Sequence, residues 1–305
     1  MTVAIQTGVV AVDGAEIYFE RRGSGPALLL ISGGGGDAGY YSALGDLLAD
    51  EYTVLTYDVR GNSRSRLTVD PTPLRMAQES ADARAVLAHN GFGSALVFGS
   101  SSGAVIALDL AARHPEAVDG VVVHEPPVIT VLPDAATYVG YFDEIERIRD
   151  REGVWPAYVC FIALVLRGHP AAVFRYRAGR WLAGSALRAV TRLLSWRRPP
   201  AGSARRGDTT ARILRNTPFF VTYEMRPIVD YVPDLAALRR IPVVMAGGHD
   251  SRRLFYCRTG EVIAERLGVE LVEFPGAHSA YFDDAPPFAA KLRTTLTRLR
   301  ERASD

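Results

Sequence analysis

The stretch that decides the fold reads Ala95-Leu96-Val97-Phe98-Gly99-Ser100-Ser101-Ser102-Gly103-Ala104-Val105-Ile106. An apolar run, a Gly-x-Ser-x-Gly sequence and an alanine-rich run in this order are typical of a strand, a sharp turn and a helix. Such a turn is crowded two positions before and two positions after its central residue, so both positions must lack a side chain. Gly99 and Gly103 satisfy this requirement for Ser101, whereas a central Ser100 would put Phe98 in a crowded position. We therefore predict that Ser101 lies at the apex of a strand-to-helix turn.

A serine displayed in this way is a candidate nucleophile. A serine hydroxyl reacts poorly unless a base stands within hydrogen-bonding reach and backbone amides face the reaction centre. A Gly-x-Ser-x-Gly sequence also occurs in loops that carry no chemistry. The apolar run before Ser101 and the helical run after it are the context that the catalytic role requires, and they favour that role here.

The composition is typical of a globular protein with a large core. Of the 305 residues, 48% are hydrophobic and 23% are charged, with a formal net charge of +1. This balance argues against a general nucleic-acid-binding protein. Cys160 and Cys257 are far apart, so neither a disulfide framework nor a metal site is expected. We see no secretory leader pattern and no run long enough to span a bilayer, so we expect a cytoplasmic protein without membrane insertion.

Strand-like and helical runs alternate at both ends of the chain, which is typical of an α/β fold with a mostly parallel sheet. The candidate strands are 8–12, 16–21, 27–32, 52–58, 95–99, 119–124, 241–247 and 270–274. Between residues 126 and 234 the strand-like runs disappear, and helical, aromatic and arginine-rich sequence replaces them. We therefore predict an eight-stranded core domain formed by 1–125 and 235–305, with 126–234 inserted as a helical cap.

A base for Ser101 is expected at the carboxyl end of another strand, because the crevice of a doubly wound sheet lies at that edge. Of the six histidines, His278 directly follows the last candidate strand. The chain order nucleophile, acid, histidine also places the base last. We therefore predict that His278 takes the proton of Ser101.

The acid that orients His278 should follow an intermediate strand. Asp250, in Gly247-Gly248-His249-Asp250-Ser251, directly follows the strand over 241–247 and is our first choice. Glu125, which directly follows the strand ending at His124, is the alternative. A buried carboxylate beside the imidazole would fix its tautomer and stabilise the imidazolium without itself taking the proton.

Two backbone amides are expected to bind the oxyanion. One is the amide of Ser102, the residue after the nucleophile. The second should come from the glycine loop, residues 33–36, with Gly34 as the first candidate and Gly33 as the next, because glycine lets a backbone amide approach a ligand closely. The loop lacks the Gly-Lys-Ser/Thr ending and the Gly-x-Gly-x-x-Gly spacing of phosphate-binding loops, so we expect no nucleotide cofactor.

Together these residues resemble the α/β-hydrolase family over the whole chain apart from 126–234. The resemblance also rests on Tyr57-Asp58-Val59-Arg60-Gly61-Asn62-Ser63-Arg64-Ser65, which is similar to the family's Asp-x-Arg-Gly-x-Gly-x-Ser. One departure is Ser32, where the family often has histidine before the glycine loop. The resemblance implies a catalytic triad of Ser101, His278 and Asp250, no metal or organic cofactor, and a cap that covers the active site.

The expected function is hydrolysis of a carboxylic ester, lactone or thioester through an acyl-enzyme on Ser101. A biosynthetic thioesterase or cyclase, a C–C hydrolase, and a cofactor-free oxygenase or perhydrolase are alternatives on the same fold. A non-catalytic ligand receptor is a further alternative. The serine at position 101 argues against haloalkane dehalogenase and epoxide hydrolase chemistry, for which the resemblance would require aspartate.

The segment 126–234 suggests which partners the protein would meet. Some of its aromatic side chains would suit an apolar acyl substrate, although packing inside the cap is the plainer interpretation for most of them. Between Arg175 and Arg215 there are eleven arginines and a single acid, Asp208. Such a stretch would suit an acidic carrier protein or an anionic surface, although a solvated face is the plainer interpretation of a charge run.

Overall fold

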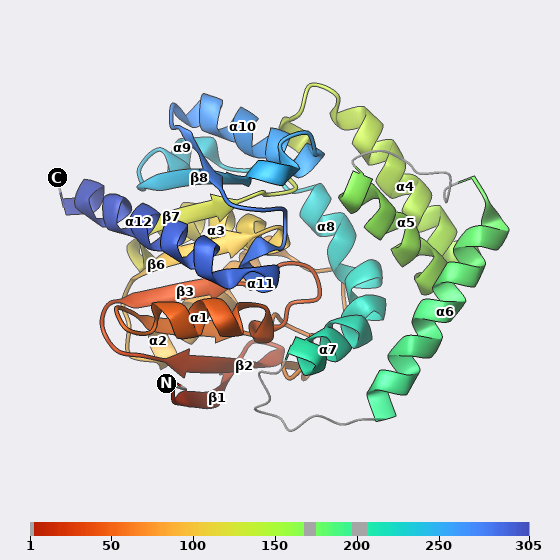
Figure 1. The fold of residues 1–305 in the computed structure, drawn as a ribbon, viewed down its shortest axis with the longest axis horizontal. Helices are drawn as coiled ribbons and strands as arrows, with labels where there is room; N and C mark the ends of the chain where they lie inside the picture. Colours follow the sequence, from red (N-terminus) through yellow and green to blue (C-terminus); the bar gives the residue numbers. More distant parts are fainter. Residues whose placement is uncertain (1–2, 168–174, 197–205, 305) are drawn as a thin grey trace.

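Residues 3–167, 175–196 and 206–304 are described by the computed structural model, and Figure 1 shows a central sheet with helices on both faces. Eight strands in the described chain follow the order β1-β2-β4-β3-β6-β7-β8-β9, and β5 (Arg66–Leu67) pairs with β2 beside this path. The path strands are β1 (Ile5–Val12), β2 (Ala15–Arg22), β3 (Ala27–Ile31), β4 (Thr53–Tyr57), β6 (Ala95–Ser100), β7 (Val118–His124), β8 (Val243–Gly248) and β9 (Leu271–Phe274). Neighbours from β4 to β9 are parallel, whereas β2 is antiparallel to β1 and β4. The predicted mostly parallel α/β sheet is confirmed.

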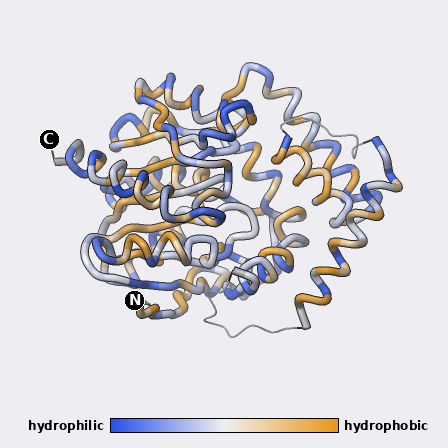
Figure 2. Tube along the Cα trace, in the orientation of Figure 1, coloured by the Kyte–Doolittle hydropathy of each residue, from blue (hydrophilic) through white to orange (hydrophobic). Residues whose placement is uncertain are grey.

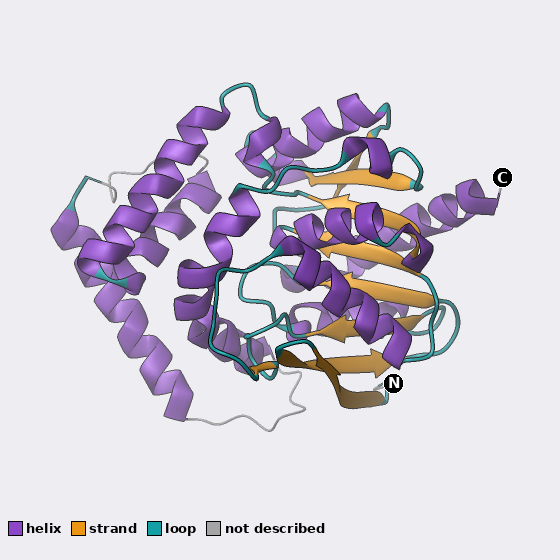
Figure 3. Cartoon of the chain, turned by 180° about the vertical axis from the view of Figure 1, so that it is seen from behind, coloured by secondary structure: helices purple, strands orange, loops and turns teal. Residues whose placement is uncertain are grey.

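The central strands are apolar throughout because helices cover both of their faces. Every residue of β3, β4 and β6 is buried, as expected for strands inside a parallel sheet. Helices α1 and α12 pack on one face of the sheet, and α2, α3 and α10 pack on the other face. Figure 3 shows the sheet and its helices from behind. These helices are α1 (Ser42–Leu48), α2 (Met76–His89), α3 (Ser102–Arg113), α10 (Phe255–Leu267) and α12 (Ala285–Ser304).

The pairing of three central strands brings their carboxyl ends to one edge of the sheet. Ile31 at the end of β3 is in register with Gly99 of β6. Ser100 at the end of β6 is in register with His124 at the end of β7. The residues that follow these strands therefore leave the sheet side by side, at the edge where ligands bind in doubly wound folds.

The cap segment, residues 126–234, contains helices and no strand among its described residues, and Figure 1 shows these helices beyond the carboxyl edge of the sheet. Its elements are η3 (Ile129–Val131), α4 (Ala135–Glu152), α5 (Val154–Arg167), α6 (Arg177–Trp196), α7 (Arg206–Phe219), the π-helical turn η5 (Phe220–Glu224) and α8 (Met225–Val229). Gly153 ends α4 at a φ of +99°, a conformation that glycine adopts without strain, and the chain turns there into α5. No described helix of the protein is both long and apolar enough to span a bilayer.

Helix α6 is amphipathic, and Figure 2 shows hydrophobic and hydrophilic residues alternating along it. It approaches α5 closely at Gly184, where an added Cβ would lie 2.9 Å from the backbone of Trp155 and Pro156. Arg180 is buried and pairs with Glu152 of α4. Of the arginines in this stretch, Arg197, Arg198 and Arg205 lie outside the described residues. Binding of an acidic carrier or an anionic surface to this stretch stays a prediction.

Candidate active site

Ser101 lies at the turn between β6 and α3 with a φ of +58° and a ψ of −129°. A non-glycine residue at positive φ is strained, and it persists only where the surrounding structure enforces it. A Cβ on Gly99 would lie 2.3 Å from the carbonyl oxygen of Gly103, and a Cβ on Gly103 would lie 2.1 Å from that of Ile31. The closeness of the two arms of the turn therefore requires glycine at position 99, and the contact between the turn and β3 requires glycine at position 103.

His278 follows β9, and its Nδ1 lies 2.5 Å from Oε2 of Glu125. Glu125 follows β7 and is fully buried, and its Oε1 accepts a hydrogen bond of 2.8 Å from the amide of Gly248. Burial alone would raise the pKa of Glu125, but the hydrogen bond to His278 and the amide of Gly248 hold that pKa below its usual value. The pair therefore consists of an ionised carboxylate and an imidazole that it orients through Nδ1.

Asp250, our first choice for the acid, does not lie beside His278. It is exposed in the short helix η6 (His249–Ser251), and its backbone amide donates to the carbonyl oxygen of Gly276 at 3.1 Å. Glu125 lies beside Nδ1 of the imidazole instead. The backbone of Gly248 packs against this carboxylate, so that a Cβ on Gly248 would lie only 3.2 Å from its Oε1. Asp250 lies two residues after Gly248, where the chain has left the neighbourhood of the imidazole and the side chain is exposed. The prediction that Asp250 lies beside the imidazole of His278 is wrong, and the alternative, Glu125, lies there.

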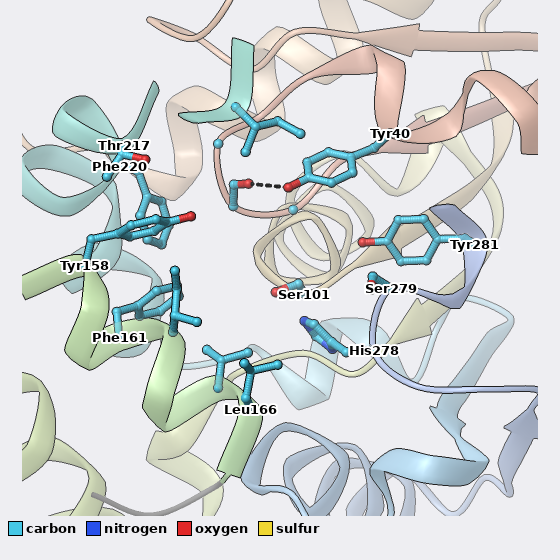
Figure 4. A pocket seen from close by; sticks show the side chains of 16 residues that line it. Tyr40, Ser101, Tyr158, Phe161, Leu166, Thr217, Phe220, His278, Ser279 and Tyr281 are labelled. Atoms are coloured by element: carbon cyan, nitrogen blue, oxygen red, sulfur yellow. Dashed lines mark hydrogen bonds between the residues drawn. The ribbon is translucent and has the colours of Figure 1, made fainter. Parts of the chain in front are cut away.

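Ser101 and His278 lie side by side on one wall of a cavity of about 190 Å³, which Figure 4 shows from close by. Cap side chains form the opposite wall, among them Tyr158, Phe161 and Phe220. The cavity thus lies between the carboxyl edge of the sheet and the cap segment, where a bound molecule would contact both.

The glycine loop borders Ser101 as predicted from the sequence. The amide of Gly36 donates to the carbonyl oxygen of Gly33 at 2.9 Å, and Gly35 has a φ of +79°, which is the geometry of a type II turn. A Cβ on Gly33 would lie 2.8 Å from Cβ of Ser101. Gly34 lines the cavity beside Ser101, and Ser102 begins α3 next to it.

A buried ion pair ties the cap segment to the glycine loop, which sequence reasoning missed. Arg212 of α7 donates from Nε to Oδ2 of Asp37 at 2.6 Å and from Nη2 to Oδ1 at 2.9 Å. Asn216, one turn further along α7, donates to the carbonyl oxygen of Gly35 at 2.5 Å. Burial would raise the pKa of Asp37, but the bonds from Arg212 hold it below its usual value. Helix α7 therefore contacts the glycine loop at two points.

Replacing Arg212 with glutamine should lower the free energy of unfolding by about 3 kcal/mol, because the buried Asp37 carboxylate loses its bidentate guanidinium partner and keeps only Arg64, whose Nη2 lies 3.9 Å from Oδ1. Both side chains are almost wholly inaccessible, at 5% for Arg212 and 0% for Asp37. Urea unfolding measures this loss. The double variant with Asp37→Asn should recover part of it, because it removes the uncompensated charge. Equal stability of Arg212→Gln and the wild type would contradict the assignment.

Behind the site, His124 is a buried neutral histidine. Its Nδ1 lies 2.9 Å from Oγ of Ser100, and its ring stacks on that of His278 with centroids 6.5 Å apart. Burial lowers the pKa of His124 to about 4, with a smaller opposing effect from the Glu125 charge. The folded protein therefore resists protonation of His124 at pH values where an unfolded histidine binds a proton.

This depressed pKa predicts a loss of stability in acid. The stability that His124 contributes is complete above pH 6.5 and is lost as the pH falls from 6.5 towards 4, because over that window the unfolded chain binds the extra proton. The wild type should therefore lose up to about 1 kcal/mol per pH unit more than a His124→Asn variant. Denaturant unfolding of both proteins at several pH values measures the difference, and parallel curves would contradict this account.

Comparison with known proteins agrees with the fold. A family profile described as alpha/beta hydrolase fold matches residues 26–147. The uncharacterized hydrolase YraK of Bacillus subtilis is 34% identical over 302 residues, which covers 97% of this chain and 98% of that protein.

Solved structures extend the likeness to the whole fold. A thermophilic esterase from Thermogutta terrifontis has a TM-score of 0.68 at 19% identity, covering 97% of this chain and 99% of that one. The esterase RhEst1 from Rhodococcus has a TM-score of 0.59 at 20% identity, covering 98% and 100%. On the strength of the full-length relative and the shared fold, this chain belongs to the α/β-hydrolase family.

Proposed function

We propose that this hydrolase cleaves carboxylic esters through an acyl-enzyme on Ser101. The observation that carries the proposal is that a strained, glycine-flanked serine lines the same cavity as an imidazole held by a buried carboxylate at 2.5 Å. A strained backbone at a cavity and a histidine oriented by a third group are the geometric signs of a nucleophile and its base.

In the proposed reaction, Oγ of Ser101 attacks the ester carbonyl while Nε2 of His278 takes its proton. Glu125 remains ionised and stabilises the imidazolium through Nδ1. The amides of Ser102 and Gly34 bind the oxyanion of the tetrahedral intermediate. His278 then gives the proton to the departing alcohol, and water, activated by the same imidazole, releases the acid and regenerates the hydroxyl of Ser101.

Esters are favoured by the character of the cavity. Its cap wall is mostly apolar, which suits the hydrocarbon parts of a neutral ester. Hydroxyl groups also line the cavity, from Tyr40 and Ser279 outside the cap and from Thr217 within it. The two esterase structures reported above share this fold. Lactones and thioesters present the same reacting carbonyl, and the same assay series can include them.

A fluorophosphonate probe tests the proposal directly. The folded protein should gain the mass of one phosphonyl group, peptide mapping should assign that mass to Ser101 rather than Ser100 or Ser102, and hydrolysis of p-nitrophenyl esters should cease in parallel. Heat-denatured protein serves as the control and should remain unlabelled. A folded protein that neither reacts with the probe nor hydrolyses any ester would overturn the proposed function.

A further inference from the structure

Two cavities of different size meet at Ser101. The large cavity is the one of about 190 Å³ described above, and the small cavity measures about 40 Å³. Ser101, Gly34 and His278 line both of them, so a substrate whose carbonyl lies at Ser101 can extend into each.

The small cavity is mostly apolar and deeply buried. It extends from Ser102 between the cap and α10, and its walls include Phe142, Met225, Ile228, Val229, Phe255 and Tyr256. None of these six residues is more than 6% exposed. A space of this kind binds hydrocarbon, because burying apolar surface there is favourable whereas a polar group would lose its hydration without gaining a partner.

The large cavity is polar on one side and reaches the surface. Hydroxyl groups of Tyr40, Ser279 and Tyr281 line the side next to the glycine loop and His278, as Figure 4 shows. Leu166, at the end of α5, also lines this cavity and is 70% exposed. Solvent and departing molecules therefore have a route past Leu166.

The order of events in ester cleavage assigns a substrate part to each cavity. The acyl group stays bonded to Ser101 while the alcohol departs and water enters, so the alcohol needs the route to solvent and the acyl chain does not. We propose that the small cavity binds a short apolar acyl chain, that the large cavity binds the alcohol, and that Phe161 and Phe220 set the acyl length limit. This inference rests on the proposed ester hydrolysis.

The size of the small cavity limits the acyl chain. A single water molecule occupies about 10–15 Å³ of a cavity measured in this way. The cavity of about 40 Å³ therefore holds about three non-hydrogen atoms of the substrate beyond its carbonyl. Acetyl to butyryl groups therefore fit, and longer straight chains require the wall to move. Protein interiors resist such displacement because they are closely packed.

Phe161, Val165 and Phe220 line both spaces, and the two rings form the larger part of the wall between the cavities. Their ring centroids are 4.9 Å apart in an edge-to-face arrangement. Phe220 also rests on the glycine loop, since a Cβ on Gly34 would lie 3.4 Å from its ring. Removing either ring would join the small cavity to the large one and make room for a longer acyl chain.

The test is a series of p-nitrophenyl esters from acetate to decanoate, with rates divided by the fraction of sites that a fluorophosphonate titrates. The wild type should have its highest kcat/KM at acetate to butyrate and at least a tenfold lower value at octanoate. Phe220→Ala and Phe161→Ala should each move the maximum by two or more carbons. Leu166→Ala is the matched control, because this side chain lines the large cavity alone and its loss should leave the acyl profile unchanged.

Three outcomes distinguish a failure of the acyl-chain assignment from a failure of the proposed ester hydrolysis. A titrated wild type that hydrolyses octanoate as well as butyrate overturns the acyl assignment alone, and so does a Leu166→Ala profile shifted as far as that of Phe220→Ala. Failure of the wild type to react with the probe or with any ester overturns the proposed function instead. Should Phe220→Ala fail to fold, Phe220→Leu keeps most of the packing and should still shift the maximum by at least one carbon.

Discussion

Replacing Ser101 with alanine is expected to lower kcat for a short-chain ester by about 10⁴- to 10⁶-fold, the range found when a serine nucleophile is removed. The substitution removes Oγ, which forms the covalent bond, while His278, Glu125 and the cavity stay in place. KM should change little, because the groups that bind the substrate remain. Steady-state kinetics measures the loss, and intact mass should show that the fluorophosphonate no longer labels the protein.

Ser102→Ala is the matched control for this substitution. Ser102 is a neighbouring buried serine, and its proposed role uses the backbone amide, which alanine keeps. Its kcat should stay within about tenfold of the wild type, well short of the loss of a nucleophile. A Ser101→Ala protein that keeps more than a tenth of the wild-type kcat would exclude the covalent mechanism.

Replacing Glu125 with glutamine is expected to lower kcat by about 10³- to 10⁴-fold, as neutralising the acid of a serine triad does elsewhere. Glutamine has nearly the same shape and can still accept the amide hydrogen of Gly248, but it carries no charge. Without the carboxylate, His278 loses both its favoured tautomer and the stabilisation of its imidazolium. The effect should appear in kcat, with the reaction rate of the fluorophosphonate falling in parallel.

Asp250→Asn provides the comparison that separates the two acids. Asp250 is exposed and lies away from the imidazole, so its kcat should remain within about threefold of the wild type, as for a surface substitution. Circular dichroism should be unchanged in both variants, and thermal unfolding should be unchanged in Asp250→Asn. A large loss in Asp250→Asn with little loss in Glu125→Gln would show that the acting acid is not the one beside His278.

The two candidate acids mark the limit of sequence reasoning about this site. Both follow strands of the same parallel sheet, and both satisfy the expected chain order. Their local sequences cannot decide between them, because the choice depends on which carboxylate reaches a loop that begins after a third strand, β9. The register of β7 against β8 places Gly248 next to Glu125, and in this arrangement Glu125 rather than Asp250 lies beside His278.

The contact between Arg212 and Asp37 has the same origin. Asp37 follows the glycine loop in the sequence, and a buried aspartate there would need a cation. The two residues are 175 positions apart, and the stretch around Arg212 offers many arginines, so no pattern selects the partner. The sequence predicts that 126–234 is helical, but it does not predict that α7 packs against the glycine loop.

The sequence alone determined the features that depend on neighbours in the chain. They include the strand-to-helix turn at Ser101 with its two glycines, the alternation of strands and helices, the glycine loop and the position of His278 after the last strand. Steric limits at a turn and hydrophobic periodicity act over a few consecutive residues, so the sequence of those residues is enough to predict them. Only the tertiary structure showed that Glu125 lies beside His278, that α7 contacts the glycine loop and that Phe161 packs against Phe220, because each contact joins residues that are far apart in the sequence.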